Sequence, residues 1–421
     1  MKVKLFLPIG VLYLSIFFSC SHHLTKSGME KDNEAEPVSI ILGNENLLMN
    51  YPDLLKGKRV GLVTNPSGVN SKLIPTADIL FNNKDINLTA LFGPEHGIRG
   101  AVHAGDHVAD DVDPQTGIPV YSLYGKNRKP TAEMMQNVDV MIFDIQDIGS
   151  RSYTYIYTMA MVMEAAAENS KEVVILDRPN PVGGIRVEGN LVEKGFESFV
   201  GLYPIPYRHG MTIGELALLF NTEYDIKCKL TVIPMLNWKR DMLWEDTDLE
   251  WVPTSPHIPH KNSPLFYCAT GTIGELHTVS NGVGYTSPFE LIGAPWIEGE
   301  NLAKALNDLK LPGVFFRPLY FRPYYFQFTG ETCQGVQVHL IEPKNCELFT
   351  MGLHIIETLN ELYPEQKILE NEERVDMFNK VMGCDWIRND LIKNVPVDQI
   401  EKKWRPELNK FLKTREKYLI Y

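Results

Sequence analysis

Residues able to do acid–base chemistry cluster in one short segment of this 421-residue chain, GPEHGIRG at positions 93–100. It holds Glu95, His96 and Arg99, and its glycines allow the backbone to turn tightly beside a ligand. The mostly apolar residues 86–92 precede it and predict a buried strand. A carboxyl group at a strand exit, next to a cation, is a good candidate for a general acid or a nucleophile. The alternative is a surface turn whose charges pair with each other.

Three further segments carry polar side chains just after an apolar run or just before a predicted helix. Their notable residues are Asp144, Gln146, Asp147, Arg151 and Tyr153, then Asp177 and Arg178, then Arg208 and His209. Glycoside hydrolysis requires two carboxyl groups, because one protonates the leaving oxygen while the other stabilises or attacks the oxocarbenium carbon. We therefore expect Glu95 to act together with Asp144 or Asp147. His96 and His209 would tune these groups or donate protons.

The arginines of these segments suit a different task. Arg151, Arg178 and Arg208 carry guanidinium groups, whose planar forks match the two oxygens of a carboxylate. We expect them to bind an acidic group of the substrate. The alternative is that at least one Asp–Arg pair is a buried structural ion pair.

A metal site is a second interpretation of the first segment and the residues after it. His96, His103, Asp106 and His107 are possible ligands, and His103 and His107 would share one face of a helix. The Ala-Gly pair between them and the acidic run that follows favour a loop instead, so we expect no metal. The motifs G-x-G-x-x-G, G-x-x-x-x-G-K-[ST] and G-x-S-x-G do not occur, and we expect no cofactor.

Strand-like apolar runs alternate with helical segments in the first half of the chain. Strands are predicted at residues 58–64, 86–92, 138–145, 172–177 and 230–235. Helices are predicted at residues 75–81, 157–169 and 212–221, the last with a capping box formed by Thr212 and Glu215. This alternation predicts an α/β fold with a Rossmann-like, doubly wound, mostly parallel sheet. The carboxyl ends of parallel strands share one edge, so the acid-rich loops could converge there.

The composition changes at residues 237–263, which hold three tryptophans and a proline-rich run. These side chains suit either the apolar face of a sugar ring or a domain interface. We expect a Rossmann-like catalytic domain at residues 38–264, a smaller α+β C-terminal domain at residues 265–421, and a cleft between them. The second domain begins near a glycine-rich loop, residues 271–284, that contains Glu275.

The first residues have the composition of an export signal. Lys2 and Lys4 precede an apolar run at residues 5–18, and Ser19 precedes Cys20. We expect residues 1–20 to be a lipoprotein signal peptide with lipidation at Cys20, and plain export is the alternative. Residues 21–37 are polar and predict a flexible tether. The expected location is the cell envelope, anchored by lipid to a membrane and facing the periplasm or the cell surface.

Charge and cysteine content exclude other classes of protein. The formal net charge is −12 and no face rich in Lys and Arg is evident, so we expect no nucleic-acid partner. Cys228, Cys268, Cys333, Cys346 and Cys384 contain no C-x-x-C pair. We interpret them as small buried apolar residues, with a single disulfide as the alternative.

Several segments, taken in order, resemble the bacterial exo-β-N-acetylmuramidase family of peptidoglycan glycoside hydrolases, formerly a domain of unknown function. The matching motifs are TNPSG at 64–68, FGPEHGIRG at 92–100, FDIQDIGSRSYTY at 143–155, DRPNP at 177–181, RHGMT at 208–212 and PFELIGAPW at 288–296. The resemblance covers about residues 38–421. It implies a Rossmann-like domain, a smaller C-terminal domain and a cleft between them.

The resemblance also implies an activity, the removal of N-acetylmuramic acid from the non-reducing ends of cell-wall glycan fragments. The Glu of the family's GPEHG motif is its favoured catalytic residue and corresponds to Glu95. The lactyl carboxylate of muramic acid would explain why the site is rich in arginine. We expect the substrate-binding residues to be Asn65, Arg99, Gln146, Arg151, Tyr153, Asp177, Arg178, Arg208, His209 and Glu275.

The chain departs from the family pattern in one loop. Family members usually carry S-E-G-R-G-T, whereas this chain has Asn281 and Val283 at the Glu and Arg positions. A second departure places His257 in the proline-rich run. These differences motivate an alternative function, a surface lipoprotein that binds cell-wall sugar without cleaving it. A metal-dependent hydrolase is the third alternative.

Overall fold

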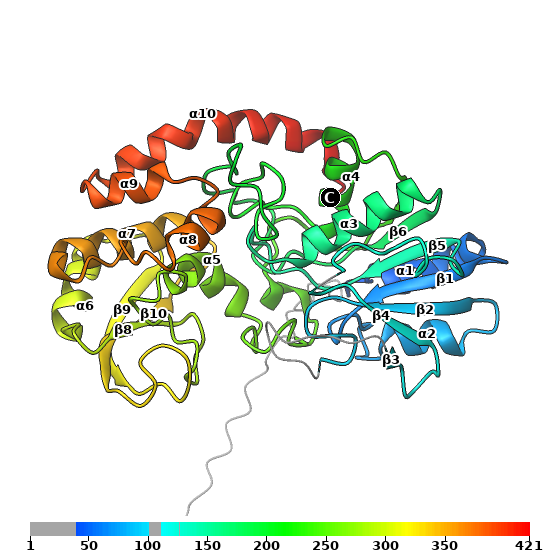
Figure 1. Cartoon of the computed structure of the whole chain (residues 1–421), viewed down its shortest axis with the longest axis horizontal. Helices are drawn as coiled ribbons and strands as arrows, with labels where there is room; N and C mark the ends of the chain where they lie inside the picture. The colour runs from blue at the N-terminus through cyan, green and yellow to red at the C-terminus, as the bar shows by residue number, and fades with distance from the viewer. Residues whose placement is uncertain (1–38, 101–110, 126) are drawn as a thin grey trace, which may run out of the picture. The chain divides into compact units, whose positions relative to one another are not determined.

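Seven strands form one sheet in the computed structural model, which describes residues 39–100, 111–125 and 127–421. They are β1 (Arg59–Thr64), β2 (Asn87–Gly93), β3 (Asp111–Val112), β4 (Pro119–Ser122), β5 (Val140–Asp144), β6 (Glu172–Leu176) and β7 (Lys229–Ile233). The order is β3-β4-β2-β1-β5-β6-β7, and the neighbours are parallel except β3 and β4 (Figure 1). The chain winds outward from β1 and later returns to β5 on its other side. The predicted doubly wound sheet is therefore confirmed, with its switch point between β1 and β5.

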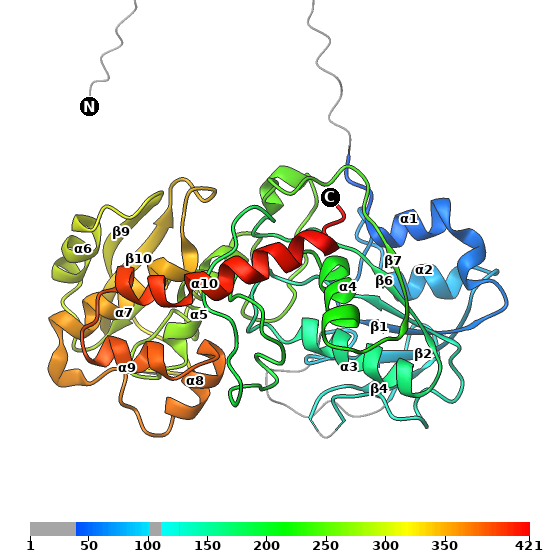
Figure 2. The same cartoon turned by 90° about the horizontal axis from the view of Figure 1, so that it is seen from above.

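Helices cover both faces of this sheet (Figures 1 and 2). They are α1 (Gly43–Asn50), α2 (Thr76–Asn82), α3 (Tyr155–Glu168) and α4 (Ile213–Glu223). Val60 and Leu62 of β1 join the apolar core that contains side chains of α1 and α2, whereas Val63 joins the core that contains α3 and α4. Alternate side chains of a strand point to opposite faces, so burial of both faces explains why the strands are nearly continuous apolar runs.

The start of α4 matches the sequence pattern. The Thr212 hydroxyl accepts a hydrogen bond from the backbone N–H of Glu215 at 3.3 Å, and the Glu215 carboxylate accepts one from the N–H of Thr212 at 3.0 Å. Two donors that the helix cannot satisfy internally are thereby paired. The predicted capping box is confirmed.

The rest of the chain forms a smaller part in which helices pack on an antiparallel sheet. Its described strands, in sheet order, are β8 (Leu291–Ala294), β10 (Cys333–Leu340) and β9 (Val314–Phe321). Its helices are α5 (Ser263–Gly274), α6 (Gly299–Asp308), α7 (Leu348–Leu362), α8 (Val375–Met382), α9 (Trp386–Ile392) and α10 (Val397–Arg415). Short 3-10 helices occur at η1 (Pro52–Leu55), η2 (Trp244–Thr247), η3 (Pro364–Gln366) and η4 (Glu416–Tyr418). The predicted α+β character of this part is confirmed.

Apolar side chains from the loops of the large part pack into the core of the smaller part. Ile148, Val182 and Tyr207, from loops at the edge of the large sheet, pack in the same cluster as α5 and α7. Trp251 packs against this cluster and meets Trp244 edge to face, with ring centroids 4.8 Å apart. For these two tryptophans the interface interpretation is therefore the one that the structure supports.

Helix α10 carries the end of the chain back to the large sheet (Figure 2). Phe411 joins the core beneath α3 and α4, and the Arg415 guanidinium donates to the backbone oxygens of Gly184 and Gly210. The hydroxyl of Tyr421 donates to Asp177 Oδ2 at 2.6 Å, just past the end of β6. Within the described ranges, no helix has both the length and the apolar character needed to cross a membrane.

Candidate active site

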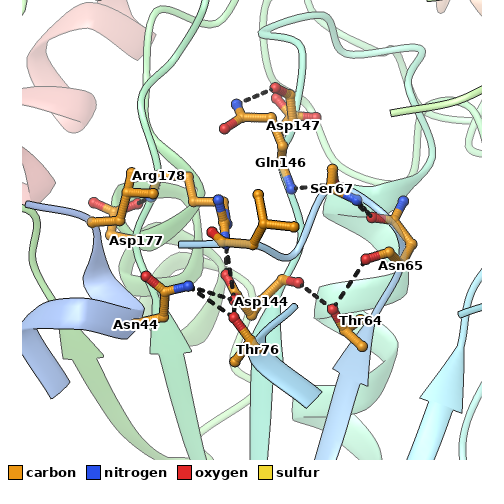
Figure 3. Close-up of polar contacts among 12 residues, drawn as sticks. Asn44, Thr64, Asn65, Ser67, Thr76, Asp144, Gln146, Asp147, Asp177 and Arg178 are labelled. Carbon is orange, nitrogen blue, oxygen red and sulfur yellow. Dashed lines mark hydrogen bonds and ion pairs between the residues drawn. The ribbon is translucent and has the colours of Figure 1, made fainter. Parts of the chain in front are cut away.

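The exits of β1 and β5 are joined by a continuous set of hydrogen bonds (Figure 3). The Thr64 hydroxyl donates to the backbone oxygen of Asp144 at 2.9 Å. The N–H of Gln146 donates to Ser67 Oγ at 3.0 Å, and that hydroxyl donates to Asn65 Oδ1 at 2.5 Å. This network fixes the loops at the switch point, where the sequence predicted the site.

Glu95 lies in a strained turn directly after β2. The N–H of Gly97 donates to the backbone oxygen of Pro94 at 2.9 Å, and His96 takes a φ of 73°, which is rare for a residue with a side chain. Backbone strain of this kind is typical of functional sites. The half-buried Glu95 carboxyl accepts a 3.4 Å contact from the hydroxyl of Thr154, the N-cap residue of α3.

Asp147 faces His209. Its Oδ2 accepts a hydrogen bond from the N–H of Gly149 at 2.7 Å and lies 3.4 Å from His209 Nε2. His209 Nδ1 accepts from the N–H of Met211 at 3.2 Å, so we assign the ring proton to Nε2, on the side of Asp147. Asp147 Oδ1 is buried without a hydrogen-bond partner among the described residues. This carboxylate oxygen of Asp147 is therefore not engaged by any group in the described part of the chain, and it lies beneath the protein surface.

Asp144 does not have such a free oxygen. Its side chain is 0% exposed and pairs with Arg178 through Nε at 2.5 Å and Nη2 at 2.9 Å. It also accepts from Thr76 Oγ1 at 2.6 Å and from Asn44 Nδ2 at 3.4 Å (Figure 3). The alternative of a buried structural ion pair applies here. Of the two candidates for the second carboxylate, the geometry favours Asp147.

Arg151 and Arg208 are also used inside the protein and do not present a fork to a ligand. The Arg151 guanidinium is fully buried and donates to four backbone oxygens, those of Asn190, Ile205, Val381 and Met382. Arg208 pairs with Glu188 at 2.6 Å and donates to the backbone oxygen of Val182. In this structure the guanidinium groups of these two arginines and of Arg178 are thus engaged by the protein itself, and their binding to a substrate carboxylate stays a prediction. Their partners are loops brought together by the fold.

Arg99 and Asp177 likewise have partners. Arg99 binds both oxygens of Asp113, each at 2.9 Å, and contacts Asp78 at 3.0 Å. Hydrogen bonds from Arg99 and Thr116 outweigh burial and hold the pKa of the Asp113 carboxyl below its ordinary value. Burial raises the pKa of Asp177 to about 6, although Tyr421 and other groups donate to it. Through these hydrogen bonds Asp177 connects the end of β6 to the start of α4 and to the C-terminus.

Gln146 and Asn65 help to hold the loops. The Gln146 amide donates to the backbone oxygens of Asp147 and Pro179, both at 2.7 Å. Asn65 donates to the backbone oxygen of Thr254 at 3.3 Å. Asn65 Oδ1 accepts hydrogen bonds from Ser67, so both the nitrogen and the oxygen of the Asn65 amide have partners.

Thr254 is a residue that sequence reasoning missed. Its backbone oxygen accepts from the Tyr155 hydroxyl at 2.7 Å, and its own hydroxyl lies 2.7 Å from that of Tyr153. Tyr153 and Tyr155 flank Thr154, which contacts Glu95. Thr254 thereby connects the proline-rich segment to the Glu95 site. Its position inside that segment, between two prolines, was the only sequence signal.

A cavity of about 680 Å³ adjoins these tyrosines. Tyr267 lines it, and the Tyr267 ring lies 5.8 Å from that of Tyr153. The other rings in its wall belong to His257, His277, Phe289, Tyr325 and Phe326. The volume is in the usual range for a small-molecule site, and aromatic faces suit the apolar face of a sugar.

Glu275 lies in the wall of the same cavity, at the end of α5. Its carboxylate accepts from Arg374 Nη2 at 2.6 Å, and its backbone oxygen accepts from Arg374 Nε at 3.1 Å. Burial raises the pKa of Glu275, against the lowering effect of Arg374. Burial, and then the charge of Arg374, lower the pKa of His277. Asn281 and Val283, at which the chain departs from the family pattern, line this cavity too.

The metal interpretation rests largely on residues outside the described ranges. His103, Asp106 and His107 lie in the segment 101–110, whereas His96 is described and buried. Within the described part of the chain, no group of three or more His, Cys, Asp or Glu side chains is arranged to hold a metal ion.

The fold and the site together define a class of protein. A carboxyl group on a strained turn and a second carboxylate lie in loops at the carboxyl edge of a doubly wound sheet. The ring of Tyr153, in the second of these loops, packs against Tyr267 in the wall of an aromatic cavity. The fold is that of a two-domain α/β protein, and two carboxyl groups at such an edge are what glycoside hydrolysis requires.

Comparisons with known proteins give the family. The N-terminal model of the exo-beta-N-acetylmuramidase NamZ matches residues 60–262, and its C-terminal model matches residues 265–421. The chain therefore belongs to the NamZ family, and the resemblance inferred from its motifs is confirmed.

Relatives and solved structures agree with this assignment. The chain is 50% identical over 392 residues to the peptidoglycan beta-N-acetylmuramidase NamZ of Bacillus subtilis. This match covers 93% of this chain and 94% of the relative. A DUF1343 family protein of Bacteroides fragilis is 47% identical, with a TM-score of 0.87 over 91% of this chain and 99% of its own. Another from the same organism is 29% identical, with a TM-score of 0.73 and the same coverage.

Proposed function

We propose that this chain is an exo-acting β-N-acetylmuramidase that releases N-acetylmuramic acid from the non-reducing ends of peptidoglycan fragments. Membership of the NamZ family and the name of its Bacillus subtilis relative support the substrate. The structural observation that carries the proposal is the position of Glu95, half-buried on a strained turn at the N-terminus of α3.

The two carboxyl groups have different surroundings, and we assign them different roles. Glu95 is partly exposed and protonates the leaving-group oxygen as the glycosidic bond breaks. A water molecule then adds its oxygen to the anomeric carbon, and the proton that this water releases restores the acid form of Glu95. Asp147 is nearly enclosed, and its unpartnered Oδ1 stabilises the positive charge that develops on the sugar ring. His209 lies beside Asp147, with its Nε2 at 3.4 Å from Oδ2.

Replacing Glu95 with Gln tests this assignment. The variant keeps the shape of the side chain but cannot donate the acid proton, so turnover should fall by roughly 10²- to 10⁴-fold. The assay is release of free N-acetylmuramic acid from purified muropeptides and from a chromogenic β-N-acetylmuramide. Glu300→Gln, on the exposed face of α6, is the matched control and should keep full activity. Unchanged turnover of the Glu95 variant would remove this residue from the mechanism.

We also propose that residues 1–20 are a lipoprotein signal and that Cys20 carries the lipid anchor. Two lysines, an apolar run and a small residue before the cysteine support this proposal. Cells fed an alkyne-tagged fatty acid should label the wild-type protein, and Cys20→Ser should abolish labelling and release the protein from membranes. Membrane association of the Cys20→Ser protein equal to that of wild type would contradict the anchor.

A further inference from the structure

A muramidase has to recognise one group that distinguishes its sugar from N-acetylglucosamine. Muramic acid carries a lactyl ether with a carboxylate at the O3 position. Selecting this group calls for a positively charged donor in the sugar-binding cavity, and a guanidinium gives the strongest directional bonds to a carboxylate. This inference rests on the proposed function and asks which residue supplies that charge.

The arginines near the strand exits do not supply it. Arg151 and Arg208 are fully buried and bound to backbone oxygens or to Glu188, and Arg178 is 3% exposed and bound to Asp144. Arg99 contacts two carboxylates and does not line the aromatic cavity.

Arg374 has the position and the donors that the task requires. It lines the cavity of about 680 Å³ and its side chain is 26% exposed. A guanidinium has five N–H groups, and Glu275 receives one from Nε and one from Nη2. No hydrogen bond joins Nη1 to any residue of the described ranges. The edge formed by Nη1 and Nη2 can therefore receive two oxygens of a carboxylate.

We propose that Arg374 is the specificity-determining residue that binds the lactyl carboxylate of muramic acid. Glu275 holds the guanidinium from one side, and the open edge binds the substrate from the cavity. His277 lies in the same wall, where burial and then the charge of Arg374 lower the pKa of its ring. The aromatic rings of Tyr267 and Phe289 in that wall suit the apolar face of the sugar.

The Glu275–Arg374 pair differs from the structural Asp144–Arg178 pair in its exposure. Asp144 and Arg178 are 0% and 3% exposed, whereas Glu275 and Arg374 are 29% and 26% exposed. The Glu275–Arg374 pair therefore leaves part of its guanidinium accessible from the cavity.

The test compares two substrates that differ only in the charge of the lactyl group. These are a chromogenic β-N-acetylmuramide and its lactyl methyl ester. The wild-type enzyme should prefer the acid, and Arg374→Met should lose roughly 10- to 100-fold in kcat/KM on the acid while changing little on the ester. Arg374→Lys should keep part of the preference. Arg317→Met, a matched loss of charge on the exposed side of β9, should keep the wild-type ratio.

The ratio of the two substrates separates recognition from folding, because a misfolded enzyme loses both activities equally. The double variant Arg374→Met/Glu275→Gln removes the unpaired carboxylate that the single change leaves behind, and it should show the same lost preference. An acid-to-ester ratio that persists in both variants would overturn the proposal.

A binding measurement keeps this proposal separate from the proposed function. In calorimetry, the Glu95→Gln protein should bind N-acetylmuramic acid more tightly than N-acetylglucosamine. Adding Arg374→Met should remove this difference in affinity. If the wild-type enzyme cleaves neither chromogenic substrate, the proposed function fails whatever the binding result. If it cleaves the acid but binding is insensitive to Arg374, only the specificity assignment fails.

Discussion

Replacing Asp144 with Ala should destabilise the protein strongly. Asp144 accepts hydrogen bonds from both Nε and Nη2 of Arg178, and from Thr76 and Asn44. The pair is 0% and 3% exposed, so water cannot replace the lost carboxylate. Removing one partner of a buried ion pair leaves an uncompensated charge and costs about 3–5 kcal/mol.

Arg59 and Asp139 form a matched pair elsewhere in the same sheet. Arg59 also donates to its carboxylate through Nε at 3.0 Å and Nη2 at 2.7 Å, but these side chains are 41% and 40% exposed. An exposed pair of this kind contributes about 0–1 kcal/mol. Asp139→Ala should therefore cost far less than Asp144→Ala, although the hydrogen-bond geometry of the two pairs is similar.

Urea unfolding followed by tryptophan fluorescence measures both variants under the same conditions. The expected result is a large drop in the urea midpoint for Asp144→Ala and a small one for Asp139→Ala. Equal losses in the two variants would refute the argument that burial sets the energy. If the Asp144→Ala variant is as stable as the wild type but inactive, the result would instead support a catalytic role for Asp144.

Three further outcomes are expected. Asp147→Asn should lower turnover by roughly 10²- to 10³-fold while shifting the urea midpoint little, because it loses charge but keeps the acceptor for Gly149; a large loss of stability with normal turnover would contradict its role. The folded-state pKa of Asp177 is raised to about 6, so the folded chain binds a proton that the unfolded chain has lost. Stability from this group is present at pH 4 and is lost as the pH rises through about 6, and Asp177→Asn should flatten the dependence of the urea midpoint on pH between about 4 and 7. Treatment with a metal chelator should leave turnover unchanged, since two carboxyl groups suffice for the reaction; activity that is lost and then restored by added zinc would favour the metal interpretation.

Local patterning was enough to predict the main elements of the sheet. The predicted strand at residues 138–145 is β5 (Val140–Asp144), and the helix predicted at residues 212–221 is α4 (Ile213–Glu223). Both follow from short-range physics, because a strand buried on both faces has to be apolar and a helix start needs side-chain acceptors. The edge strand β3 (Asp111–Val112) was not predicted, since its two residues are exposed and carry no apolar pattern.

The roles of neighbouring charged residues were harder to predict. Asp144 and Asp147 both follow β5, and the sequence left open which of them is the second carboxylate. Asp144 is enclosed by groups from α1, α2 and the loop after β6, whereas Asp147 faces His209 with one oxygen unpaired. Asp144 is thus a structural residue, whereas Asp147, three positions later in the chain, is a candidate catalytic residue.

The sequence by itself determined the fold class, the family and the loops that hold Glu95 and Asp147, because these depend on local patterns and motifs. Only the tertiary structure decided which arginines remain available to a ligand. Arg151 is bound by backbone oxygens of Asn190, Ile205, Val381 and Met382, and Arg374 is held by Glu275 about a hundred residues earlier in the chain. Every residue has a backbone oxygen, so such partners leave no mark in the sequence, and the pairing of distant charges depends on how the loops and helices pack.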